Sequence, residues 1–157
     1  MKTVDKAVAA VVRENGGRRE LLVFRHPRAG VQLPKGTVEP DETLVAAVLR
    51  ELHEESGLLL DAEPVPIGTW NRVLDGSFGE AATLDLHVWH LHLLPAPTGL
   101  PDHWSHRASG SAEEDGLVFA FHWLPIDEGL RGALHPVFGA TVEMLLTHPA
   151  GPPGGPR

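Results

Sequence analysis

The fold is decided by residues 36–58, which read GTVEPDETLVAAVLRELHEESGL. Five aliphatic side chains in this stretch recur at the spacing of one helix face: Leu44, Val45, Val48, Leu49 and Leu52. This periodicity predicts an amphipathic helix over residues 42–57. Asp41 is its expected N-cap, the charge of Glu42 suits the positive end of the helix dipole, and Gly57 is its expected stop.

Three glutamates on the predicted helix are candidate metal ligands. Glu51, Glu54 and Glu55 stand at positions i, i+3 and i+4, so they are neighbours on one helix face. Like charges at this spacing repel by roughly a few tenths of a kcal/mol per pair. A Mg²⁺ or Mn²⁺ ion converts this repulsion into binding, because both ions prefer carboxylate oxygens. A solvated acidic helix face is the plain alternative for three glutamates taken alone.

The regions on either side of this helix read mostly as strands. Apolar runs and turn signals predict strands at residues 6–13 and 20–24, joined as a hairpin, then a loop over 25–41 with a short strand near 31–33. Further β-rich segments cover 65–74, 82–94 and 117–125, a long loop covers 95–116, and a closing helix covers 134–148. This order predicts an α/β domain over residues 1–150 with a mixed sheet between two helices. Residues 151–157 are predicted to be a disordered Gly/Pro tail.

Composition narrows the class of protein. The 157 residues carry a formal net charge of −8 and contain no cysteine. The negative charge disfavours generic nucleic-acid binding, and no apolar run is long enough to cross a bilayer, so no membrane partner is expected. Without cysteine the chain has neither disulfides nor thiolate metal sites, which fits a cytoplasmic location.

The stretch from Gly36 to Leu58 resembles the Nudix box, the signature of the Nudix hydrolases. The family pattern is G-x5-E-x7-R-E-U-x-E-E-x-G-U, where U is a bulky aliphatic residue. It is matched without a gap by Gly36, Glu42, Arg50, Glu51, Leu52, Glu54, Glu55, Gly57 and Leu58. Multiplying average residue frequencies gives a chance match on the order of 10⁻⁷ for a chain of this length.

The resemblance implies a Nudix α/β/α sandwich and a metal-dependent pyrophosphohydrolase. Its substrate would be a small-molecule nucleoside diphosphate derivative, and residues 33–40 look like a segment of some diadenosine polyphosphate hydrolases in the family. The resemblance makes Glu51, Glu54 and Glu55 ligands of Mg²⁺ or Mn²⁺, with Glu55 central. The box residues with structural roles would be Gly36, Glu42, Arg50 and Gly57.

The general base and the substrate-binding residues are less determined by the sequence. The resemblance leaves two sources for the base: the box, with Glu54 as candidate beside the catalytic Glu55, and a later loop, with Glu114 as candidate; Glu80 is a third choice. Lys35, Arg25 and Trp104 are the chosen substrate-binding candidates, Trp104 because it falls in the predicted polar loop; His26, Arg28 and Arg72 are further cations that could meet phosphates. A zinc site at His103 and His106 is disfavoured because a third ligand is lacking.

Two other kinds of function remain as alternatives. A non-catalytic nucleotide-sensing Nudix module usually has a damaged box, whereas this box is intact. A diphosphate isomerase of the isopentenyl type uses a cysteine, and this chain has none. A homodimer is compatible with the sequence.

Overall fold

The computed structural model describes residues 1–75 and 83–148 of the chain. Its strands are β1 (Lys2–Asn15), β2 (Arg18–His26), β3 (Gly30–Gln32), β4 (Lys35–Thr37), β5 (Val65–Asp75), β6 (Leu84–Pro95), β7 (Trp104–Arg107) and β8 (Val118–Pro125). Its helices are α1 (Leu44–Ser56) and α2 (Gly139–Thr147), and the short 3-10 turns η1 (Glu128–Leu130) and η2 (Pro136–Phe138) precede α2. No helix in the described ranges is both long and apolar enough to span a membrane.

Strand β1 is the centre of a mixed sheet. Within the described residues the sheet has eight strands, with the order β5-β6-β1-β2-β8-β7, β3 beside β2 and β4 beside β1. β1 runs parallel to β6 and antiparallel to both β2 and β4. On one side of β1, β4 pairs with residues 6–8 and β2 pairs with residues 12–15, so two segments share that side.

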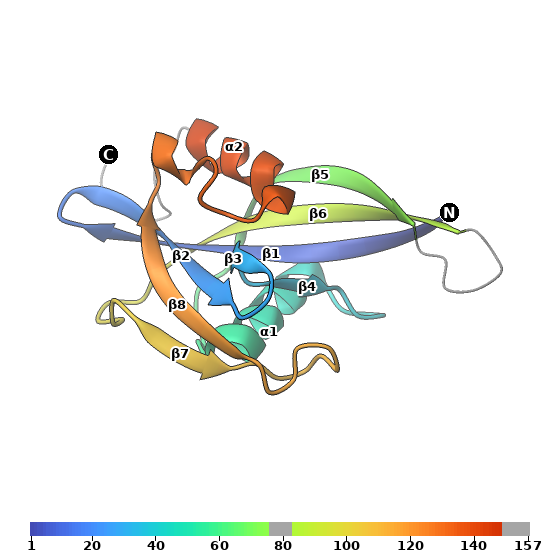
Figure 1. Cartoon of the computed structure of the whole chain (residues 1–157), viewed down its shortest axis with the longest axis horizontal. Coiled ribbons are helices and arrows are strands. Elements are labelled where there is room, and N and C mark those ends of the chain that lie inside the picture. Colours follow the sequence, from blue (N-terminus) through green and yellow to red (C-terminus); the bar gives the residue numbers. More distant parts are fainter. Residues whose placement is uncertain (76–82, 149–157) are drawn as a thin grey trace.

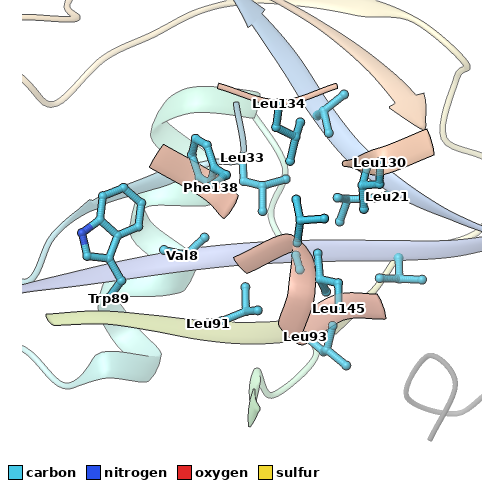
Figure 2. Close-up of a cluster of buried hydrophobic side chains, with 14 residues drawn as sticks. Val8, Leu21, Leu33, Trp89, Leu91, Leu93, Leu130, Leu134, Phe138 and Leu145 are labelled. Atoms are coloured by element: carbon cyan, nitrogen blue, oxygen red, sulfur yellow. The ribbon is translucent and has the colours of Figure 1, made fainter. Parts of the chain in front are cut away.

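Both faces of β1 are covered, which is why its sequence reads as a continuous apolar run. Its alternating side chains divide between two buried clusters, with Ala7, Ala9 and Val11 on the α1 side and Val8, Ala10 and Val12 on the α2 side. The two helices lie on opposite sides of the sheet (Figure 1). In the α2-side cluster, Phe138 and Leu145 pack with Val8 and Leu91 of the sheet (Figure 2). The predicted α/β/α sandwich is therefore confirmed.

The structure confirms several predicted elements. β1 and β2 form the predicted hairpin, and the turn between them places Gly16 and Gly17 at φ 60° and 81°. β5 and β6 are antiparallel neighbours in the two β-rich segments, and Gly57 ends α1 with φ 81°. The predicted tail at 151–157 and the candidate Glu80 lie outside the described residues.

Three local predictions were wrong. Residues 95–116 are not one long loop, because they contain β7, which pairs with β8. The last helix begins at Gly139 rather than at residue 134, since η2 occupies the residues before it. The N-cap of α1 is Thr43, whose Oγ1 accepts from the Ala46 N–H at 3.1 Å; Asp41 has φ 64° and lies outside the helix.

Candidate active site

Arg50 is the hub that ties the loop before α1 to the helix. Its Nε and Nη2 donate to the carboxylate of Glu42 at 2.7 and 2.9 Å, and Nη2 also donates to the Thr37 carbonyl at 3.0 Å. Its Nη1 contacts Glu51 at 2.7 Å and Glu54 at 3.3 Å. The hydrogen bonds from Arg50 lower the pKa of Glu42. Glu42 is thus held as an anion just before the helix. Its ion pair with Arg50 ties the segment that precedes α1 to the helix itself.

Glu55 is the most deeply buried carboxylate of the box, with 2% of the residue exposed. One oxygen accepts from the Lys35 backbone N–H at 2.9 Å. Burial raises the pKa of Glu55 well above its usual value, and the nearby carboxylates of Glu114 and Glu51 raise it further. A carboxylate that is both desolvated and surrounded by like charge is a group that a bound cation would stabilise strongly.

Gly36 leaves the space that Glu51 occupies. A Cβ atom at Gly36 would lie 2.0 Å from the Glu51 carboxyl carbon, so the missing side chain is a requirement of space. Burial raises the pKa of Glu51 to about 7, although the hydrogen bond from Arg50 opposes that shift. Glu51 therefore lies against β4, at the wall of a cleft.

The later loop brings Glu114 to the same place. Glu114 follows Glu55 by 59 residues, yet its charge is the largest electrostatic contribution to the raised pKa of Glu55. Its Oε2 lies 3.8 Å from His26 Nε2, and the His26 Nδ1 accepts from the Arg28 N–H at 3.0 Å. The structure thus brings Glu114 near Glu51 and Glu55, while Arg50 contacts both Glu51 and Glu54.

A cleft of about 560 Å³ lies between the box and this loop. Glu51 and Glu114 line it, and so do four groups that can attract phosphate: Lys6, His26, Arg28 and Lys35. Lys6 was missed from the sequence because it is a single lysine at the start of an apolar run. The cleft is also lined by Lys35, His26 and Arg28, which were chosen from the sequence.

Arg25 and Trp104 lie elsewhere. Both line a separate shallow depression of about 390 Å³. Trp104 belongs to β7, where its Nε1 donates to the Ser56 carbonyl at 3.0 Å and its ring stacks on Phe121 at 5.2 Å. The prediction that Trp104 lies in a polar loop is therefore wrong. The four-residue edge strand has no apolar period that could have revealed it.

The residues present fit a divalent cation by their chemistry. No group of three metal-binding side chains has already converged within the described ranges. The donor set nevertheless consists of carboxylate oxygens, and Glu55 is buried among like charges with one backbone N–H as its hydrogen-bond donor. Hard cations such as Mg²⁺ and Mn²⁺ select oxygen ligands of this kind.

Comparison with known proteins agrees with the fold and the box. A model of the NUDIX domain matches residues 3–144, so the chain belongs to the NUDIX family. Nudix hydrolases in general use divalent metals. A search of curated proteins finds no significant match.

Solved structures show the same fold at low sequence identity. An Ap4A hydrolase from C. elegans is 18% identical, with 90% of this chain and 95% of that chain covered and a TM-score of 0.53. The NUDIX domain of Shewanella oneidensis NrtR, complexed with ADP ribose, is 15% identical, with 92% and 86% covered and a TM-score of 0.58. A MutT protein from Methanosarcina mazei Go1 is 22% identical, with 92% and 93% covered and a TM-score of 0.55.

Proposed function

We propose that this protein is a metal-dependent pyrophosphohydrolase that cleaves a diphosphate bond in a nucleoside diphosphate derivative. The observation that carries the proposal is a single cleft lined by both carboxylates and cations. Glu51 and Glu114 line it, and so do Lys6, Arg28 and Lys35. A negative diphosphate would be attracted by the cations and placed beside carboxylates suited to a bound metal.

Glu51, Glu54 and Glu55 would hold Mg²⁺ or Mn²⁺, and such an ion would supply charge neutralisation of the diphosphate and a lower pKa of the attacking water. Lys6 and Lys35 hold the phosphate oxygens as point charges. Arg50 orients the carboxylates of Glu51 and Glu54 through its Nη1. Water attacks one phosphorus atom, the bridging P–O bond breaks, and the leaving phosphate takes the electron pair.

Glu114 is our choice for the base that accepts the proton of the attacking water. Its carboxylate lines the cleft, whereas that of Glu54 is engaged by Arg50 at 3.3 Å. The Arg28 N–H donates to His26 Nδ1, which places the imidazole proton on Nε2, the nitrogen that faces Glu114. His26 can therefore orient the carboxylate without taking its proton.

Dinucleoside polyphosphates are the substrate subclass that we propose to test first. Residues 33–40 resemble the corresponding segment of some diadenosine polyphosphate hydrolases. A nucleotide-sensing module and a diphosphate isomerase remain the alternatives. Cytoplasmic location, a homodimer and the lack of generic nucleic-acid binding stay predictions.

A substrate panel tests the activity. Diadenosine tetraphosphate, ADP-ribose, a nucleotide sugar and a dNTP would be incubated with Mg²⁺ or Mn²⁺, and phosphate-containing products would be separated by chromatography. We expect hydrolysis of at least one substrate and complete loss in excess chelator. Full turnover with chelator present would rule out the metal mechanism, and tight nucleotide binding without hydrolysis would favour the sensing module.

A pair of variants locates the base. We expect Glu114→Gln to lower kcat by about 10²-fold, because a lost general base typically has an effect of this size. Its KM should change little, since the amide keeps the size of the side chain. Steady-state kinetics of Glu114→Gln and Glu54→Gln on the best substrate decide the assignment. A nearly silent Glu114→Gln beside an inactive Glu54→Gln would move the base into the box.

A further inference from the structure

The loop over residues 108–117 is fastened to the end of α1. Its two ends are closed by the Ala108 N–H to Leu117 carbonyl hydrogen bond at 2.8 Å and the Gly116 N–H to Ala108 carbonyl hydrogen bond at 2.9 Å. The Ser109 N–H donates to the backbone carbonyl of Glu54 at 3.1 Å. This segment, which carries Glu114, therefore has a fixed position relative to the box.

Gly110 is the point of closest approach between this loop and a box side chain. A Cβ atom at Gly110 would lie 2.2 Å from the Glu54 carboxyl carbon and 2.3 to 2.4 Å from its two oxygens. The backbone of Gly110 also has φ 86°, which L side chains rarely adopt. The Glu54 carboxylate thus occupies the volume that any other residue at position 110 would need.

We propose that Gly110 is a positioning residue that sets the place of the Glu54 carboxylate in the metal-binding cluster. This inference rests on the proposed function, because it assigns Glu54 to that cluster. Gly36 leaves room for the Glu51 carboxylate in the same way, because a Cβ atom at Gly36 would lie 2.0 Å from the Glu51 carboxyl carbon. Gly36 belongs to the box, whereas Gly110 follows Glu54 by 56 residues and no box pattern includes it.

A side chain at position 110 would act on Glu54 rather than on the loop. The Ser109 hydrogen bond holds the loop on α1, while the Glu54 carboxylate is the far end of a flexible side chain. The carboxylate would therefore be the part that shifts, and it would leave its 3.3 Å contact with Arg50. Such a change disturbs the ligand arrangement more than it disturbs folding.

Gly116 supplies the matched control, because it lies in the same loop. Its φ is 84°, but a Cβ atom there would have no atom within 4 Å. Gly110→Ala and Gly116→Ala should therefore carry the same backbone strain and lower the Tm by a similar few degrees. Only Gly110→Ala should weaken Mn²⁺ binding, by about 10-fold, as expected when groups that orient metal ligands are disturbed.

Titration calorimetry with Mn²⁺ alone measures this difference without any substrate. If Gly110→Ala binds Mn²⁺ as tightly as Gly116→Ala, the proposal is overturned. Should either alanine variant fail to fold, Gly110→Asn and Gly116→Asn form a second pair, because asparagine tolerates positive φ and still adds a Cβ atom. The same specific loss of Mn²⁺ affinity is expected at position 110.

A double-mutant cycle tests the contact itself. Glu54→Asp withdraws the carboxylate by one methylene and should weaken Mn²⁺ binding in the wild-type background, yet weaken it much less in the Gly110→Ala background. Additive losses would overturn the proposal. If the wild type hydrolyses no diphosphate but the Mn²⁺ results are as expected, the proposed function fails and the role of Gly110 stands. If the wild type is active and the two glycine variants behave alike, only the role of Gly110 fails.

Discussion

Two arginine–glutamate clusters on opposite sides of the sheet use the same chemistry in different surroundings. On α1, Arg50 binds Glu42 and Glu51, whose side chains are 13% and 12% exposed. Near α2, Arg131 binds Glu143, whose side chain is 52% exposed, through two hydrogen bonds of 2.7 and 2.8 Å. The bond lengths in the two clusters are alike, so the difference lies in access to water.

The pKa shifts show what that difference does. Arg131 lowers the pKa of Glu143 through its hydrogen bonds, as an ordinary ion pair does. For Glu51 the effect of burial is larger than that of Arg50, and the pKa rises to about 7. Hydrogen bonds alone therefore do not distinguish the candidate site from an ordinary surface ion pair. Burial makes it unfavourable to ionise the carboxylates of the α1 cluster, and a bound cation would offset that free-energy cost.

The largest contrast between the clusters should come from neutralising one carboxylate in each. Glu55→Gln should lower kcat by about 10³-fold or more, because it removes the central buried ligand of the proposed metal. Without metal its Tm should hold or rise, since the amide oxygen can still accept from the Lys35 N–H and the unfavourable interaction with the Glu114 and Glu51 carboxylates is removed. Glu143→Gln should leave kcat unchanged. Steady-state kinetics and thermal melts of both variants measure this contrast. A Glu55→Gln variant with the wild-type kcat would contradict the proposed role of Glu55 as a metal ligand.

The next contrast comes from removing each arginine. Arg50→Ala leaves Glu42 and Glu51 without their counter-ion, which should destabilise the protein by about 2 kcal/mol. It should also raise the Mg²⁺ concentration needed for half-maximal activity by about 10-fold. Arg131→Ala should show neither effect, because its cluster is exposed to water. Denaturant unfolding and Mg²⁺ titrations check both expectations; equal unfolding midpoints for the two variants would contradict the role of burial.

The smallest effect should be a pH dependence of stability to which Glu51 contributes. Because its folded pKa is raised to about 7, the folded protein holds this proton between pH 4.5 and about 7, where the unfolded chain has lost it. The stability contributed by protonated Glu51 is therefore lost as the pH rises through this window. The buried His92 and the half-buried His26, His87 and His122 have lowered pKa values and act in the opposite direction.

Comparison with Glu51→Gln measures this contribution together with the part of the raised Glu55 pKa that Glu51 causes. In the presence of chelator, the free energy of unfolding of the wild type minus that of Glu51→Gln should fall steadily from pH 5 to pH 7.5. The histidine effects are common to both proteins, so they cancel in this difference. Thermal melts across that range supply the measurement. A difference that stays flat, or that grows with pH, would show that burial does not control this carboxylate.

The sequence by itself determined the parts that depend on local periodicity. The spacing of Leu44, Val48 and Leu52 predicts α1, and the same spacing places Glu51 and Glu55 near one another, because a helix repeats every 3.6 residues. The apolar runs predicted β1 and β2 for a similar reason. The sequence did not predict two short features. One is β7, which has four residues and no apolar period. The other is the cap at Thr43, which follows Glu42, the residue whose carboxylate accepts from Arg50.

Only the tertiary structure decided which distant residues meet the box. The pairing of β7 with β8 fixes the ends of the loop that brings Glu114 to Glu55, and β1 carries Lys6 to the same cleft. The proposed role of Gly110 depends on the Glu54 carboxylate, which occupies the space that a side chain at position 110 would need. Burial was also invisible in the sequence, because a glutamate on a helix reads alike whether it faces water or the sheet. Strand register and packing, which join residues far apart in the chain, turned an acidic helix face into a candidate catalytic site.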